Sequence, residues 1–360
     1  MKALRFFYLS IFLLSGCTMT QMHVEFKWDT LKSLPDTTGF AGSFAGISNN
    51  ALLVVGGSNF PDNGAPWKGS TKVWYDNIFV LKHPDGEWHQ AGVLPITLGY
   101  GVSVSTRQGL VCVGGSNDTG HVAKAFLLNY KQDSVVVENF SDLPFALANT
   151  CGALVNNKIY IAGGIRNPHS RETENSFFCL DLSKEERSWQ QLASLPGQSR
   201  MLSVAAEANG KFYLIGGTEL IDGKRVYLKD SYSYDEKEGW KRLADLPYPV
   251  VAAPSPAYSN GNFLYVFGGD DGKLASSDLK EKHPGFSDNI LVYDIKNDAW
   301  NVSGKIYTDI KENAVEVPNE SVWAPVTTTM ALWNNKIVIP GGEVRPATRT
   351  PKVLSAEIIK

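Results

Sequence analysis

The residues closest to recognisable chemistry lie near the C-terminus, in the segment Gly-Glu-Val-Arg-Pro-Ala-Thr-Arg-Thr. Glu343 directly follows the pair Gly341-Gly342, and Arg345 and Arg349 come two and six residues after it. A carboxylate can act as a general base, and an arginine can hold an anion through two parallel hydrogen bonds. The spacing therefore indicates a base beside an anion-binding group, and a solvated surface ion pair is the alternative.

Metal or cofactor chemistry has little support in the sequence. None of the six histidines lies at metal-ligand spacing from another, and no pair of cysteines does so. We therefore expect neither a metal nor a cofactor. Cys112, Cys151 and Cys179 lie in apolar, strand-like stretches, where a free thiol packs as a small apolar group. In an exported protein two of them could form a disulfide, and Cys151 with Cys179 is the most plausible pair.

A repeat identifies the elements that must position these residues. Six apolar stretches end in Gly-Gly, at Gly57, Gly115, Gly164, Gly217, Gly269 and Gly342. Most units also carry a Leu-Pro pair before the doublet, and a Tyr-Asp strand or a Trp after it, as in Leu195-Pro196, Tyr234-Asp235 and Trp240. This order resembles the kelch repeat, in which about 50 residues form one four-stranded blade. The sequence therefore predicts an all-β fold, a six-bladed kelch-type β-propeller.

The repeat also predicts how the ring closes. The last unit stops after its third strand, near Ile358, and an unassigned strand, Glu25 to Leu31, lies at the other end of the chain. We expect this N-terminal strand to complete the last blade. Long polar insertions follow Gly57 and precede Trp323. Such loops on a rigid scaffold often carry function.

The innermost strands are expected to be rich in small residues, because they crowd around the axis. The stretches at 39–49 and 99–103 fit this position, and packing alone explains their glycines. Tyr100 could nevertheless line the channel and present its hydroxyl. All six loops after the doublets should emerge on one face around the axis. Glu343 is therefore expected at the mouth of the channel.

The N-terminus predicts export. Lys2 and Arg5 precede an apolar run too short to cross a bilayer, and the run ends in Leu-Ser-Gly-Cys at Cys17. This ending resembles the bacterial lipoprotein signal, with Cys17 lipidated after cleavage, and ordinary secretory cleavage is the alternative. The predicted organisation is a lipoprotein signal peptide at 1–16, a tether at 17–23 and a single propeller at 24–360. A lipid anchor would hold the protein to a membrane, in the periplasm or at the outer membrane.

The charge of the chain excludes one class of partner. The formal net charge is −3, and no basic stripe with interleaved aromatic residues is present. The sequence therefore gives no sign of nucleic-acid binding. Binding must depend on local sites.

Three segments together resemble a known family. They are the strand Ser-Phe-Ala-Gly-Ile-Ser-Asn at 43–49, the strand Tyr-Gly-Val-Ser at 100–103 and the segment Gly-Glu-x-Arg-Pro-x-x-Arg-Thr at 342–350. Together they look like N-acetylneuraminate epimerase, a bacterial sialic acid mutarotase. In the usual order of that family the Glu-Arg segment precedes the other two, whereas here it comes last. This order resembles a cyclically permuted mutarotase branch, and a ring whose ends meet tolerates such a cut.

The resemblance implies an isomerase that interconverts the anomers of a small-molecule sugar substrate, sialic acid, without a cofactor. Glu343 matches the family's proposed acid/base and Arg349 its carboxylate-binding arginine. The expected substrate-binding residues are Arg200, Tyr100, Asn59, Trp323 and Arg345. For Arg200 a purely structural role between blades is an equal alternative. Two rival functions remain open: a non-catalytic glycan- or protein-binding propeller, and a mutarotase for another sugar.

Overall fold

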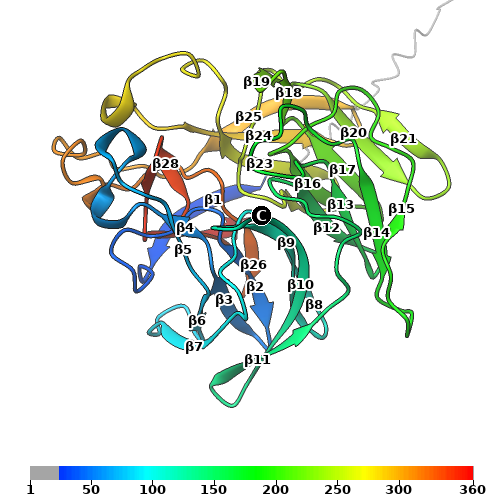
Figure 1. Cartoon of the computed structure of the whole chain (residues 1–360). Helices are drawn as coiled ribbons and strands as arrows, with labels where there is room; N and C mark the ends of the chain where they lie inside the picture. Colours follow the sequence, from blue (N-terminus) through cyan, green and yellow to red (C-terminus); the bar gives the residue numbers. More distant parts are fainter. Residues whose placement is uncertain (1–23, 360) are drawn as a thin grey trace, which may run out of the picture.

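The computed structural model describes residues 24–359, which form six antiparallel four-stranded sheets around a central axis (Figure 1). The predicted six-bladed β-propeller is confirmed. Within residues 24–359 the helical elements are four single-turn 3-10 helices. A blade cannot bury both of its faces alone, so apolar clusters fill the spaces between neighbouring sheets.

The strands of each blade run from the axis outward. Blades one to three consist of β2 (Phe44–Ser48), β3 (Ala51–Val55), β6 (Asn77–Leu81) and β7 (His89–Val93); β8 (Val102–Thr106), β9 (Gly109–Asn117), β10 (Gly120–Lys131) and β11 (Ser134–Asn139); and β12 (Cys151–Val155), β13 (Lys158–Ala162), β14 (Phe177–Asp181) and β15 (Gln190–Gln191).

Blades four to six have the same order. They consist of β16 (Val204–Ala208), β17 (Lys211–Ile215), β20 (Ser231–Asp235) and β21 (Gly239–Arg242); β22 (Tyr258–Ser259), β23 (Phe263–Gly269), β24 (Ser287–Asp294) and β25 (Ala299–Lys305); and β26 (Ala331–Trp333), β27 (Lys336–Pro340), β30 (Val353–Ile359) and β1 (Glu25–Leu31).

Small elements after the doublets complete the fold. Three hairpins pair β4 (Ser58–Asn59) with β5 (Val73–Trp74), β18 (Thr218–Ile221) with β19 (Lys224–Tyr227), and β28 (Glu343–Arg345) with β29 (Thr348–Arg349). The 3-10 helices are η1 (Pro61–Asn63), η2 (Pro66–Lys68), η3 (Lys280–Lys282) and η4 (Pro318–Glu320).

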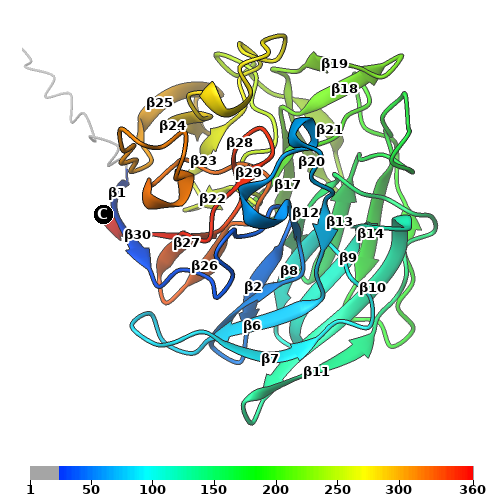
Figure 2. The ribbon, with the colours of Figure 1, turned by 60° about the vertical axis from the view of Figure 1, so that its left-hand side comes forward.

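The ring closes as the sequence predicts. β1 lies antiparallel to β30 over its whole length, from Glu25 opposite Ile359 to Leu31 opposite Val353. The N-terminal strand is thus the outer strand of the last blade (Figure 2). Phe26 on β1 packs edge-on against Phe267 of blade five, with ring centroids 5.1 Å apart, so the closing strand also joins the interface between blades five and six.

Tryptophans at or beside the outer strands of four blades connect these strands to the junctions between blades. Each indole N–H donates to a backbone carbonyl two residues before the Leu-Pro pair that begins the same repeat unit. The bonds run from Trp88 to Lys32, Trp189 to Ser141, Trp240 to Ala193 and Trp300 to Ala244, at 2.8 to 3.2 Å. These side chains combine a large apolar area with one satisfied donor. They pack in the apolar clusters between neighbouring blades.

A ring of six backbone hydrogen bonds joins the blades near the axis. In each blade one residue donates its N–H to the carbonyl of the equivalent residue in the preceding blade, over 2.6 to 2.8 Å, and the bond from Gly42 to Thr327 closes the circle. All six residues have φ between 54° and 70°, a conformation that costs energy for every residue except glycine. They are Gly42, Tyr100, Asn149, Leu202, Ala252 and Thr327. We call them the axial ring.

The axial ring also fixes the residues that follow the doublets. In each blade the residue before the ring residue forms an antiparallel bridge with the residue directly after Gly-Gly. These post-doublet residues are Ser58, Ser116, Ile165, Thr218, Asp270 and Glu343. They therefore surround the axis on one face, as the repeat predicts, and Glu343 belongs to this set.

Of the remaining sequence predictions, the structure contradicts the disulfide and does not describe the signal peptide or the tether. Cys151 and Cys179 are free and buried, and β13 lies between their strands, so the pair suggested as a disulfide does not form. Burial raises the pKa of the Cys151 thiol to about 12, which keeps it protonated. The signal peptide, the tether and Cys17 lie outside the described residues. Within 24–359, no helix is long and apolar enough to span a membrane.

Candidate active site

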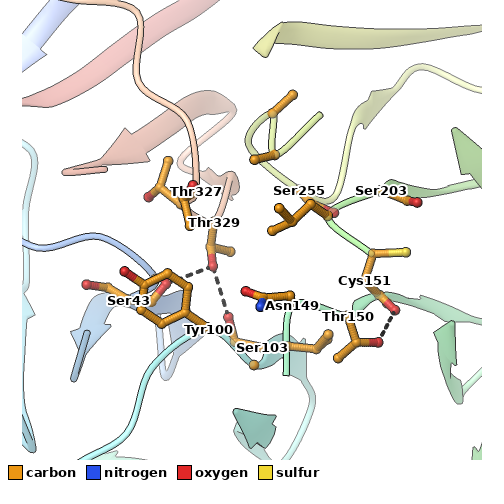
Figure 3. A pocket seen from close by; sticks show the side chains of 18 residues that line it. Ser43, Tyr100, Ser103, Asn149, Thr150, Cys151, Ser203, Ser255, Thr327 and Thr329 are labelled. Atoms are coloured by element: carbon orange, nitrogen blue, oxygen red, sulfur yellow. Dashed lines mark hydrogen bonds between the residues drawn. The ribbon is translucent and has the colours of Figure 1, made fainter. Parts of the chain in front are cut away.

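Three cavities meet at the axis on the face that carries the post-doublet residues. The central one, about 70 Å³, is lined by axial-ring residues including Tyr100, Asn149 and Thr327 (Figure 3). Beside it lie a cavity of about 520 Å³ that Lys72 lines and one of about 370 Å³ that Glu343 lines. We call these the Lys72 cavity and the Glu343 cavity. Tyr100 borders the first and Thr327 the second, so both adjoin the central channel.

The β28–β29 hairpin presents Glu343 to its cavity. Glu343 Oε1 accepts hydrogen bonds from the backbone N–H of Ala347 at 2.9 Å and from Arg349 Nη1 at 3.2 Å. Within residues 24–359 no group donates to Oε2, and the side chain is 21% exposed. One carboxylate oxygen is therefore fixed, and the other is available to a substrate.

Arg349 links Glu343 of blade six to Tyr100 of blade two. Its side chain is 3% exposed, its Nη2 lies 3.5 Å from the Tyr100 hydroxyl, and its guanidinium stands 5.1 Å from the centre of the Phe60 ring. Burial opposes the charge, but Glu343 and Tyr100 outweigh it and hold the pKa of Arg349 above its ordinary value. The structure thus brings together three residues predicted from the sequence, Glu343, Arg349 and Tyr100.

A second carboxylate lines the Glu343 cavity. Asp270 holds the same post-doublet position in blade five that Glu343 holds in blade six. Its Oδ2 accepts a hydrogen bond from the Tyr227 hydroxyl at 3.0 Å. Burial, followed by the charge of Asp270, raises the pKa of Tyr227, so this phenol stays protonated at neutral pH. His283 lines the same cavity, and burial lowers its pKa, which favours the neutral imidazole.

The blade-one insertion covers part of the Glu343 cavity. Figures 1 and 2 show the blue segment with η1 and η2 beside the red β28–β29 hairpin. Trp67 lines the cavity and donates its indole N–H to Glu281 at 2.8 Å, and Lys68 forms an ion pair with the same carboxylate. The hydrogen bonds from Lys68 and Trp67 lower the pKa of Glu281 to about 2, so the contact persists at neutral pH.

Arg345 and Trp323 lie behind the site. Arg345 is 2% exposed, donates to the Glu281 carbonyl at 2.6 Å and stacks 5.2 Å from the Trp323 ring centre. The Trp323 indole N–H donates to the Pro318 carbonyl at 2.9 Å. Neither side chain lines the three cavities. The structure therefore assigns both a supporting position for the loops around the site, in place of the predicted contact with substrate.

Asn59 and Arg200 are also held away from the cavities. The Asn59 amide donates to the Gly39 carbonyl and accepts from the Tyr75 hydroxyl, so its hydrogen-bonding groups are engaged. Arg200 is fully buried and binds both carboxylate oxygens of Asp230, at 2.7 and 3.0 Å. Of the two roles that the sequence left open for Arg200, the geometry fits the structural one. Substrate contact by Asn59 or Arg200 would require breaking these buried bonds.

Sequence reasoning missed several residues of the site. Asp270 follows Gly268-Gly269 just as Glu343 follows its own doublet, so the repeat itself could have identified it. Lys72, Trp67 and Tyr227 lie in an insertion and a hairpin outside the repeat, where spacing gives no guide. Among residues 24–359, no three His, Cys, Asp or Glu side chains gather as a metal-binding group.

Fold and site together define a class, a six-bladed β-propeller with a carboxylate site at the mouth of its axial channel. A family model described as N-acetylneuraminate epimerase matches residues 16–137 and 140–360. The chain belongs to the N-acetylneuraminate epimerase family.

Several relatives are called N-acetylneuraminate epimerase. The protein from Haemophilus influenzae (strain 86-028NP) is 36% identical over 107 residues, which cover 26% of this chain and 28% of the relative. The protein from Pasteurella multocida (strain Pm70) is 25% identical over 238 residues, which cover 59% and 57%. The aligned parts thus span less than two thirds of either relative. The solved structure of YjhT has a TM-score of 0.63 at 17% identity, covers 92% of this chain and 99% of its own, and shares the fold.

Replacing Arg200 with Met is expected to lower the free energy of unfolding by about 3–5 kcal/mol, because Asp230 would stay buried without its cation. Burial raises the pKa of Asp230, but hydrogen bonds from Arg200 and Tyr232 outweigh it, and the pKa is lowered. The ion pair therefore stabilises the fold above pH about 4, the range of an unfolded aspartate, and this stabilisation fades in acid. Denaturant unfolding at pH 7 and pH 3 measures both effects.

The matched variant is Asp230→Asn, which removes the charge from the other partner. Both variants should lose stability at pH 7, and the gap between each variant and the wild type should narrow at pH 3. If Arg200→Met unfolds at the wild-type denaturant concentration at pH 7, the structural assignment of Arg200 is wrong.

Proposed function

We propose that this protein interconverts the α and β anomers of N-acetylneuraminate. The observation that carries the proposal is the geometry of Glu343, which lines a cavity and whose Oε1 is held by Arg349 and Ala347, while no group within residues 24–359 donates to Oε2. A fixed carboxylate with one available oxygen suits proton transfer to and from a bound hydroxyl. Membership of the N-acetylneuraminate epimerase family, and the names of the relatives, support the choice of sugar.

The reaction needs two proton transfers and no net change of atoms. Glu343 takes the proton from the anomeric hydroxyl, the bond between the anomeric carbon and the ring oxygen breaks, and the ring oxygen takes up a proton. The open-chain ketone rotates, the same oxygen adds to its other face, and the protons return in reverse order. Arg349 keeps Glu343 oriented through the 3.2 Å contact.

A second proton-transfer group stands beside the first. Tyr227 and Asp270 are joined by a hydrogen bond and line the same cavity as Glu343. Anomeric oxygen and ring oxygen are different atoms of one sugar, so two acid–base groups in one cavity can serve them at the same time. We assign Glu343 to the anomeric hydroxyl and the Tyr227–Asp270 pair to the ring oxygen.

We further propose that a lipid on Cys17 anchors the protein to a bacterial membrane after export. The support is the order of charged residues, apolar run and Leu-Ser-Gly-Cys at residues 2–17. The first described strand begins at Glu25, so a short tether would separate the propeller from the lipid. The active site would then act on sugars outside the cytoplasm.

Replacing Cys17 with Ser is expected to move the protein from the membrane fraction to the soluble fraction of cells, because the acylated residue is lost. Metabolic labelling with a fatty acid should mark the wild-type protein and leave the variant unlabelled. Cys112→Ser is the control, since this thiol is buried inside the propeller and should not affect fractionation. Equal membrane association of Cys17→Ser and wild type would refute the anchor.

Replacing Glu343 with Gln should slow anomer exchange by about 10²- to 10⁴-fold, because the amide keeps the shape of the side chain and cannot take a proton. NMR of freshly released α-N-acetylneuraminate, with and without the soluble propeller, measures the rate at which the α and β signals reach equilibrium. Glu219→Gln is a matched control, because Glu219 accepts a hydrogen bond from the Ser199 hydroxyl and lines none of the three cavities.

Two results would count against this proposal. If the wild type leaves the rate of equilibration unchanged, the sialic acid assignment fails. If Glu343→Gln binds the sugar and exchanges its anomers at the wild-type rate, the protein is either a binding propeller or uses another base.

A further inference from the structure

Lys72 is the cation that the proposed function leaves unused. It lies on the blade-one insertion just before β5, half-buried, and lines the 520 Å³ cavity that adjoins the channel. Its ammonium stands 5.1, 5.4 and 5.8 Å from the ring centres of Tyr100, Trp74 and Phe60. Three aromatic rings around one ammonium attract it and hold its long side chain in place.

This lysine has no anionic partner within residues 24–359. No ion pair of the described residues includes Lys72, and the Glu343 carboxylate is bound by Arg349. Asp118 also lines the Lys72 cavity, but it is exposed and lies beyond the 4 Å of an ion pair. Burial lowers the pKa of His121 in the same cavity to about 4, so this histidine is neutral at pH 7.

Lys72 and Arg349 share their surroundings. Phe60 lies under both cations, 5.8 Å from the Lys72 ammonium and 5.1 Å from the Arg349 guanidinium. Tyr100 contacts both as well, through its ring for Lys72 and through its hydroxyl for Arg349. Two cations thus flank one wall, and within residues 24–359 only one of them, Arg349, has an ion-pair partner, which is Glu343. The remaining positive charge creates a place for one more anion.

We propose that Lys72 binds the carboxylate of the sugar acid substrate. The inference rests on the proposed function. It gives to Lys72 the role that the family resemblance implies for Arg349, because Arg349 is 3% exposed and bound to Glu343. The carboxylate of the substrate is attached to its anomeric carbon, so it must lie close to the group that deprotonates the anomeric hydroxyl. Tyr100 contacts both Lys72 and Arg349, and Arg349 contacts Glu343. These contacts connect the Lys72 ammonium to the carboxylate of Glu343.

The neutral polar groups of the Lys72 cavity suit the rest of such a ligand. Ser116, Asn117 and Asn149 line it with hydroxyl and amide groups, which can hydrogen-bond sugar hydroxyls or an N-acetyl group. Trp74 offers an apolar ring face for the carbon skeleton. Lys72 would therefore select sugar acids over neutral sugars that fit the same cavity.

The test compares N-acetylneuraminate with its methyl ester, which keeps the ring and lacks the charge. Anomer exchange of both compounds is followed by NMR for the wild type, Lys72→Met, Lys72→Arg and Lys273→Met. Lys72→Met keeps the aliphatic stem against the rings and removes the ammonium. Lys273 is the matched control, because it also stands over an aromatic ring, that of Tyr248, but pairs with Asp271 and lines no cavity of the site.

We expect Lys72→Met to lose about 10- to 100-fold in kcat/KM for the acid, mainly through KM, because one charge-assisted hydrogen bond is removed. The ratio of acid to ester in kcat/KM should fall towards one. Lys72→Arg should retain most of the preference, and Lys273→Met should match the wild type. A wild type without preference for the acid, or a Lys72→Met variant that keeps it, would overturn the proposal.

Failure of the proposed function can be told apart from failure of this inference. If the wild type exchanges the anomers of neither compound, the proposed reaction is wrong, and calorimetric binding of N-acetylneuraminate then tests Lys72 alone. Weaker binding by Lys72→Met than by the wild type and Lys273→Met supports a carboxylate site. Equal affinity of all three proteins, or no binding by any, overturns it.

Discussion

The axial ring of six backbone hydrogen bonds is the constraint on which the site depends. Five of its six members are not glycine, yet all have positive φ, at a cost of about 1–2 kcal/mol for each such residue. The circle of hydrogen bonds and the packed blades around it hold them in this conformation. Because the bridge next to each ring residue also fixes the residue after the doublet, the backbone alone places six side chains around the mouth.

Closure of the propeller brings the two ends of the chain to the site. Glu343 and Arg349 belong to blade six and Lys72 to an insertion of blade one, and these blades become neighbours only because β1 pairs with β30. The bond from Gly42 to Thr327 joins the same two blades at the axis. Acid–base chemistry and recognition of the substrate's charge therefore meet at the junction between blades six and one, beside the strand pair that joins the two ends of the chain. Tyr100 of blade two, between Lys72 and Arg349, connects the two functions.

The sequence predicted the features that repeat and missed those that do not. Six Gly-Gly ends and the spare strand at Glu25 defined the propeller and its closure, and the last doublet located Glu343, because a doublet fixes the backbone of the residue after it. Residue type alone could not separate buried arginines from available ones. Arg200 is bound to Asp230, thirty residues away in the chain, a partner that no spacing rule identifies. Lys72 lies on an insertion whose path depends on contacts with another blade, such as Trp67 with Glu281.

We propose that the mouth of the channel holds a sugar acid between Lys72 and Glu343. A crystal structure of the Glu343→Gln variant with bound N-acetylneuraminate tests it most directly, since the slow variant preserves the ligand's anomeric form. We expect the carboxylate of the sugar within hydrogen-bond distance of Lys72 Nζ and the anomeric hydroxyl at the amide of residue 343. A sugar bound elsewhere on the propeller, or at the mouth with its carboxylate turned away from Lys72, would contradict it.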